Sequence, residues 1–182
     1  MKGYLITSLL LSVISFISML YISLERSQQH ILRLKPLIYA DSLAAVLFAV
    51  MIFYILLRKE RLGFRFAYVI MAVLILLYAS SMALTGEKII VDRNLGYVLL
   101  MTDDFSYRVF FIFAMAAIAW SIILLSGYRH ALKIPLAALF IISLGIICEN
   151  ILYLAGMELF PYPVTGEFLL IVLMDYSLKI RK

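Results

Sequence analysis

Long apolar segments separated by short charged ones dominate this chain of 182 residues. Crossing the roughly 30 Å hydrocarbon core of a bilayer takes about 20 apolar residues in an α-helix. Five segments meet or approach that length, namely Tyr4–Leu24, Leu37–Leu57, Phe66–Leu84, Val109–Ser126 and Ile134–Met157. The pattern predicts an all-α fold, a polytopic transmembrane helical bundle with these five spans.

A sixth apolar segment, Val164–Leu178, is shorter and carries Glu167 and Asp175. Its roughly 15 residues cover only about 22 Å of helix, so it either spans a locally thin bilayer or lies partly buried against its neighbours. The C-terminal sequence KIRK favours a sixth crossing, because Lys and Arg anchor helix ends on the cytoplasmic side. We therefore expect six spans, with Glu167 and Asp175 as residues at the ends of the last one.

Composition strengthens the membrane interpretation. The chain is 65% hydrophobic and 15% charged, against roughly 25% charged residues in an average soluble domain. The first apolar segment is longer than a signal-peptide core and has no A-x-A cleavage site, so we interpret it as a retained span. We expect one integral membrane domain over residues 1–182, in the cell membrane.

The distribution of charge predicts an orientation. We place the N-terminus, the 58–65 and 127–133 loops and the C-terminus on the inner side. That side then has ten basic and two acidic residues, whereas the rest of the chain has six basic and nine acidic residues. The positive-inside rule then puts both termini in the cytoplasm, although segment 25–36 places three basic residues outside. The long external loop, residues 85–107, is expected to form a short interfacial helix at its LGYVLLM sequence.

Two carboxylates interrupt the apolar spans in the outer half of the bilayer. Glu149 lies about 12 Å from the outer end of the fifth span, and Asp41 about 7 Å from that of the second. Acids at similar depth on different helices can share one proton or bind one cation. Asn150, Tyr153 and Tyr39 are the candidate neutral ligands or hydrogen-bond partners of this site. The alternative is structural: Glu149 is a buried neutral acid bonded to a neighbouring helix, and Asp41 pairs with nearby basic residues.

Small residues indicate where helices pack closely. Counting 100° per residue places Gly145, Glu149 and Gly156 on one face of the fifth span, which predicts that Glu149 points into the bundle. Asn150 points elsewhere and is expected to donate an interhelical hydrogen bond. Two further sets are interpreted as packing faces: Ser8, Ser12 and Ser15 in the first span, and Ala114, Ala117 and Ser121 in the fourth.

Several functions find no support in the residues. One cysteine and two histidines exclude an intrachain disulfide and a histidine-rich metal or haem site. Nucleotide-binding and hydrolase motifs are missing, so we expect no cofactor, and the positive-inside rule accounts for the basic charge without nucleic acid.

The leading hypothesis is a proton- or cation-linked transporter or channel. The alternatives are a non-catalytic accessory or sensor subunit, and a membrane-embedded enzyme acting on a lipid-like substrate. The expected partners are the bilayer and either a second copy of the chain or another membrane subunit.

Overall fold

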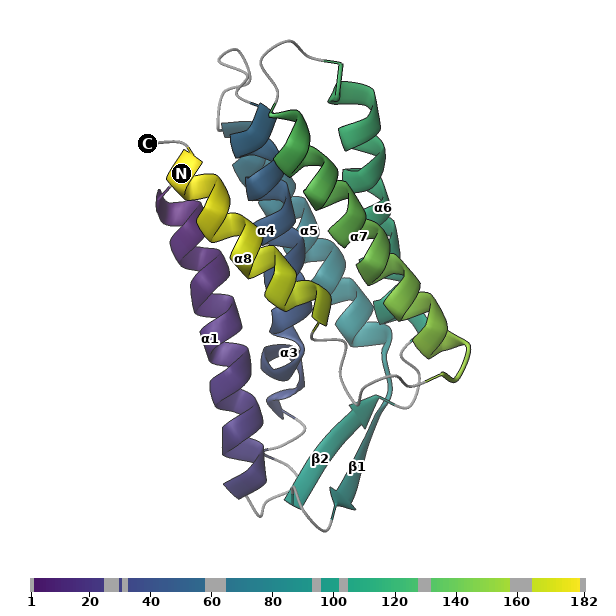
Figure 1. Cartoon of the computed structure of the whole chain (residues 1–182). Coiled ribbons are helices and arrows are strands. Elements are labelled where there is room, and N and C mark those ends of the chain that lie inside the picture. Colours follow the sequence, from purple (N-terminus) through teal and green to yellow (C-terminus); the bar gives the residue numbers. More distant parts are fainter. Residues whose placement is uncertain are drawn as a thin grey trace.

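Apolar helices of alternating direction form a single bundle in the computed structural model (Figure 1). It describes residues 2–24, 30, 33–57, 65–92, 96–101, 105–127, 132–157 and 165–180. The helices are α1 (Lys2–Leu24), α3 (Lys35–Ile38), α4 (Ala40–Leu57), α5 (Arg65–Leu84), α6 (Phe105–Leu125), α7 (Lys133–Leu154) and α8 (Thr165–Ile180). The predicted helical bundle is confirmed. Residues 58–64, 128–131 and 181–182, which carry much of the predicted inner charge, lie outside the described part.

Within the described residues, five helical segments are long and apolar enough to cross a membrane, as in a membrane protein. By length and composition they are Gly3–Ile22, Lys35–Leu57, Arg65–Leu84, Phe105–Leu125 and Lys133–Leu154. The sixth helix, α8, has 16 residues, or about 24 Å at 1.5 Å per residue. It leans across α4 and packs against α4 and α7 (Figure 1). The prediction of five long spans and a shorter sixth helix is therefore confirmed.

Helix α4 forms the centre of the bundle. It contacts α1, α5, α6, α7 and α8, and 83% of its span is buried, against 22–33% for the other four spans. Residues 43–57 are apolar on every side apart from Tyr54, so every face of α4 can pack against a neighbouring helix. The core therefore follows α4.

The segment 85–107 contains a β-hairpin, so the interfacial helix predicted there is wrong. Strand β1 (Glu87–Asp92) pairs antiparallel with β2 (Gly96–Met101), with Glu87 opposite Met101 and Asp92 opposite Gly96. The β1 sequence EKIIVD has three consecutive β-branched residues, whose stiff side chains favour an extended backbone. The hairpin lies at the end of the bundle opposite the two termini (Figure 1). We call this the hairpin end.

Helix α7 ends at Leu154, earlier than the predicted Met157. The N–H of Met157 donates to the Leu152 carbonyl at 2.9 Å, and the N–H of Gly156 donates to the Tyr153 carbonyl at 3.0 Å. Gly156 has a φ of +79°, the left-handed conformation that closes a helix in this hydrogen-bonding pattern. Gly156 thus terminates α7 and is not part of a helical packing face.

Candidate functional site

Buried polar side chains concentrate at the hairpin end of the bundle. They come from the start of α3 and α4, the end of α5, the start of α6 and the end of α7. We call this set the polar layer; its buried members are Lys35, Ser42, Ser81, Thr85, Arg108 and Asn150. Because the hydrocarbon region offers no water to buried polar groups, a layer of this kind must satisfy itself internally or bind a ligand.

Asp41 and Glu167 line one small cavity within this end of the bundle. Asp41 lies in the first turn of α4 and Glu167 in the first turn of α8, where the positive end of a helix dipole favours a carboxylate. The backbone N–H of Ser42 donates to Asp41 Oδ1 at 2.8 Å. The cavity has a volume of about 70 Å³, and a water molecule takes up about 30 Å³. It therefore has room for about two waters, or for a small cation with one water.

Residues from three helices wall this cavity. Ser12 contributes from α1, Asp41 and Phe48 from α4, and Glu167 and Phe168 from α8. Oxygen atoms in an aromatic surround suit a proton or a hard cation, which prefers oxygen ligands. Among the described residues, no group of three or more His, Cys, Asp and Glu side chains is placed to hold a metal ion.

Glu149 lies beside this pair and does not line the cavity. It is half-buried on α7, and the Glu167 carboxyl lies within electrostatic range of both Asp41 and Glu149. Glu167, interpreted from the sequence as an end residue, thus interacts electrostatically with both predicted acids. The described carboxylates of this region form a series from the central helix α4 through α8 to α7.

Arg108 is a second residue that the sequence interpretation missed. Only 7% of it is exposed. Its Nη1 donates to Asn150 Oδ1 at 3.2 Å, and its guanidinium carbon lies 3.3 Å from the centre of the Tyr153 ring. The predicted interhelical hydrogen bond of Asn150 is present, but its predicted direction is wrong, because Asn150 accepts from Arg108 and donates only to the Ile146 carbonyl of its own helix among the hydrogen bonds described. Asn150 and Tyr153, predicted as neutral partners of a carboxylate, hold this buried cation.

A pattern in the sequence could have revealed Arg108. It was placed in the external loop because the fourth span was started at Val109, whereas α6 begins at Phe105. Extending the helix by one turn puts Arg108 in line with Phe111, Met115, Ile118 and Ile122, which are all buried. Their spacing of three and four residues is that of one helical face.

Tyr39 is held beside Asp41 by a cluster of hydroxyl-bearing side chains. Its ring packs edge-to-face on Tyr107, with 5.7 Å between the ring centres. The Tyr107 hydroxyl shares a hydrogen bond with Ser42 Oγ, and Tyr78 Oη donates to the Pro36 carbonyl at 2.8 Å. These contacts join α4, α5 and α6 around the start of the central helix.

The predicted small-residue face of α7 is wrong. Gly145 is exposed, and a Cβ added there would have no atom within 4 Å. The buried face of α7 instead consists of Leu136, Leu139, Ser143, Ile146 and Asn150. The angular count grouped residues correctly but could not show which stripe faces the core.

The close glycine contact is on α8. A Cβ added at Gly166 would lie 2.2 Å from Ile146 Cγ1. Gly166 therefore lets α8 approach α7 and positions its neighbour Glu167 at the cavity.

Two of the three serines predicted as a packing face of α1 behave as predicted, and Ser12 does not. Ser8 and Ser15 are buried, and Ser8 Oγ donates to the Tyr4 carbonyl of its own helix at 3.0 Å. Ser15 Oγ donates to the Ile38 carbonyl of α3 at 2.5 Å. Packing is thus the role of these two residues, whereas Ser12 lines the cavity.

Fold and site together define a polytopic membrane protein with a half-buried carboxylate pair at one end of its helical bundle. Comparisons with protein-family models, with curated proteins and with solved structures found no match to this chain.

Proposed function

We propose that this protein binds a proton or a small cation at Asp41 and Glu167 and links that binding to transport across the membrane. The observation that carries the proposal is that two carboxylates from different helices line one cavity. Two acids in one apolar site do not both stay ionised without a counter-ion. A shared proton or a bound cation satisfies the pair.

Binding at this pair acts on the position of α8. The short helix α8 meets α4 at the cavity, so repulsion between ionised Asp41 and Glu167 pushes the two helices apart and a bound cation or proton draws them together. Glu149, on α7, is the next acid in the series. Loading and release at the pair thus provide a way to move α8 against the rest of the bundle.

The apolar remainder of α4 favours a transporter over an open channel. From Leu43 to Leu57 the central helix offers no polar side chain except Tyr54, so the described core has no polar path along α4. An ion bound at the hairpin end then reaches the other side only through a change of conformation. That is the behaviour of a carrier with alternating access.

Flux measurements in vesicles test this function. We expect the protein, reconstituted in liposomes under an imposed membrane potential, to carry protons, Na⁺ or K⁺. Asp41→Asn and Glu167→Gln are each expected to lower the flux at least tenfold. Asp175→Asn is the matched control, because Asp175 also lies on α8 but is exposed and paired with Lys179.

Each result decides between the alternatives. Unchanged flux in both variants contradicts the assignment of Asp41 and Glu167. Absence of flux for all three ions in the parent protein contradicts transport.

A second candidate function is supported by the same apolar stretch of α4. A carboxylate pair with no polar path along α4 also suits a non-catalytic sensor or accessory subunit, in which the pair reports the pH or cation concentration at the hairpin end. Co-purification of one stoichiometric membrane partner, together with absence of ion flux, is the result that favours this candidate.

A further inference from the structure

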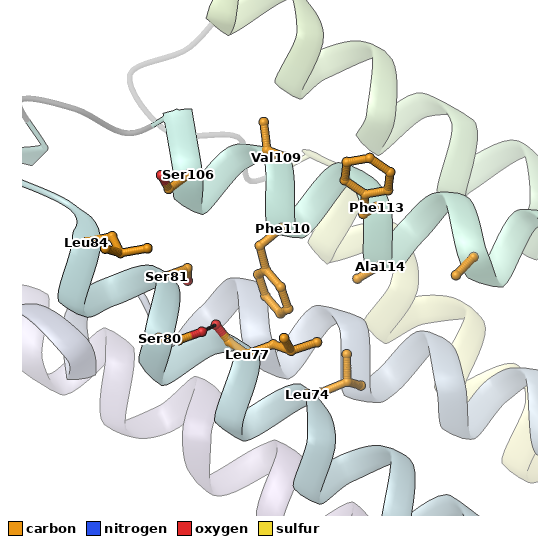
Figure 2. Close-up of a pocket in the computed structure, with 11 residues that line it drawn as sticks. Leu74, Leu77, Ser80, Ser81, Leu84, Ser106, Val109, Phe110, Phe113 and Ala114 are labelled. Carbon is orange, nitrogen blue, oxygen red and sulfur yellow. Dashed lines mark hydrogen bonds between the residues drawn. The ribbon is translucent and has the colours of Figure 1, made fainter.

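A groove separates α5 and α6 on the outer surface of the bundle (Figure 2). It runs along residues 74–84 of α5 and 106–117 of α6 and has a volume of about 480 Å³. The carboxylate cavity is lined by α1, α4 and α8, so the groove is a separate feature. A ligand in the groove is therefore independent of the proposed transport function.

Small side chains create this groove, which corrects the predicted packing face of α6. Ala117 is exposed and Ala114 only half-buried, and both line the groove instead of contacting α5 closely. Phe110 points between the two helices (Figure 2) and packs against Tyr78, with 6.5 Å between the ring centres. Phe110 and Tyr78 thus support the groove from the core side.

Polarity changes along the length of the groove. Ser80, Ser81 and Ser106 lie toward its hairpin end, whereas Leu74 and Ala114 lie toward its other end (Figure 2). Ala117 lies one helical turn beyond Ala114 on α6 and also lines the groove. None of the lining residues is charged. A molecule that fits this surface is uncharged within the groove, apolar over most of its length and polar toward the end of the bundle.

The dimensions favour a hydrocarbon chain over a helix. Leu74 and Leu84 are about 15 Å apart along α5, so a volume of about 480 Å³ gives a mean cross-section of roughly 32 Å². A helix about 10–12 Å across needs roughly 80–110 Å². One hydrocarbon chain, whose carbon contacts lie at about 4 Å, needs roughly 20 Å².

We propose that the groove binds one acyl chain of a membrane phospholipid, with its ester end beside the three serines and its methyl end near Ala117. Protein interiors and bilayers leave few voids, so the groove is filled when the protein lies in a membrane. Association in lipid rests on shape and van der Waals contact, because lipid tails are themselves apolar. The predicted property is therefore preferential occupancy of this groove over the other lipid-facing surfaces.

Photocrosslinking in liposomes measures that preference. The probe is a phosphatidylcholine that carries a diazirine midway along one acyl chain, present at a low mole fraction. After irradiation and digestion, we expect mass spectrometry to find most of the lipid adducts on residues 74–84 and 106–117. Filling the groove by Ala117→Phe is expected to lower those adducts at least fivefold, and the milder Ala114→Leu at least twofold.

Ala137→Leu is the matched control, since Ala137 is exposed on α7, away from the groove, and its adduct pattern should equal that of the parent protein. Far-ultraviolet circular dichroism verifies that each variant keeps its helices, and Ala114→Leu serves if Ala117→Phe does not fold. Adducts spread evenly over all lipid-facing helices overturn the proposal. So do adducts at the groove that neither folded variant reduces, or crosslinks from the groove to a second copy of the chain.

Discussion

Arg108 is a buried cation that contacts an amide group and an aromatic ring. Its guanidinium donates to Asn150 and lies over the face of Tyr153, a combination suited to the flat, delocalised charge of arginine. Charge-assisted hydrogen bonds are about twice as strong as neutral ones. The hydrogen bond therefore links the start of α6 to the end of α7 and holds one positive charge within the polar layer.

Replacing Asn150 tests how much its hydrogen bond with Arg108 stabilises the protein. Asn150→Leu removes this acceptor from the Arg108 guanidinium, and we expect a loss of about 1–3 kcal/mol in the free energy of unfolding, the usual consequence of deleting one partner of a buried hydrogen bond to a charged group. Thermal unfolding in detergent micelles measures the loss. Ser143→Ala is the control, because the buried Ser143 hydroxyl bonds only within its own helix, to Leu139. A loss no larger for Asn150→Leu than for Ser143→Ala would contradict the account.

Sequence reasoning found part of the site at the level of residues. Asp41 and Asn150 were identified because a polar side chain in an apolar span has few harmless explanations. Glu167 and Arg108 were missed because each lies in the first turn of its helix, where a charged residue is ordinarily anchored at the membrane surface. Only the packing of α8 on α4, and of α6 on α7, shows that these two charges point inward.

The crossing of α7 and α8 depends on one glycine. Gly166 is buried where Ile146 crosses it, and its missing side chain brings α8 close enough for Glu167 to reach the cavity. Close approach at a small residue is the usual basis of helix association in lipid. The geometry of the candidate site is thus set by the neighbouring residue as much as by the carboxylate itself.

A double substitution tests this crossing. Gly166→Ala places a Cβ 2.2 Å from Ile146 Cγ1, and we expect a loss of about 1–3 kcal/mol of stability, as for other overpacked contacts. Adding Ile146→Ala removes the clashing atoms, so the double variant should lose less than the sum of the two single losses. Gly145→Ala is the control, because its Cβ meets nothing within 4 Å. Thermal unfolding of the parent protein, the two single variants and the double variant measures these losses. If the loss of the double variant equals the sum of the two single losses, Gly166 and Ile146 do not make this contact.

Element boundaries followed from the sequence where hydrophobicity alone decides them. The five long helices fall within a few residues of their predicted spans because length and apolar content are sufficient for a membrane helix. The β-hairpin was missed because the same apolar residues suit either an interfacial helix or a strand pair. The choice of strands follows from the β-branched residues of β1 and from pairing with β2, which composition does not reveal.

At the scale of the whole molecule, α4 organises the bundle and the other helices alternate around it. The start of α1 and the end of α8 lie at the same end, opposite the hairpin (Figure 1). This agrees with an even number of membrane crossings. The distribution of charged residues in the sequence predicts which end of the bundle faces the cytoplasm. The end that carries both termini should face the cytoplasm, and the hairpin and polar layer should face outward.

Cysteine labelling tests that direction. In a Cys148→Ala background, which removes the single native thiol, Gly86→Cys lies between α5 and the hairpin, and Gly127→Cys lies just after α6. Both glycines are exposed. A membrane-impermeant maleimide should label residue 86 in intact cells and residue 127 only after permeabilisation. The reverse pattern would mean that the carboxylate pair faces the cytoplasm, and labelling of both from outside would contradict a crossing by α6. Because proton or cation binding is proposed at the hairpin end, this result also decides from which side the site is loaded.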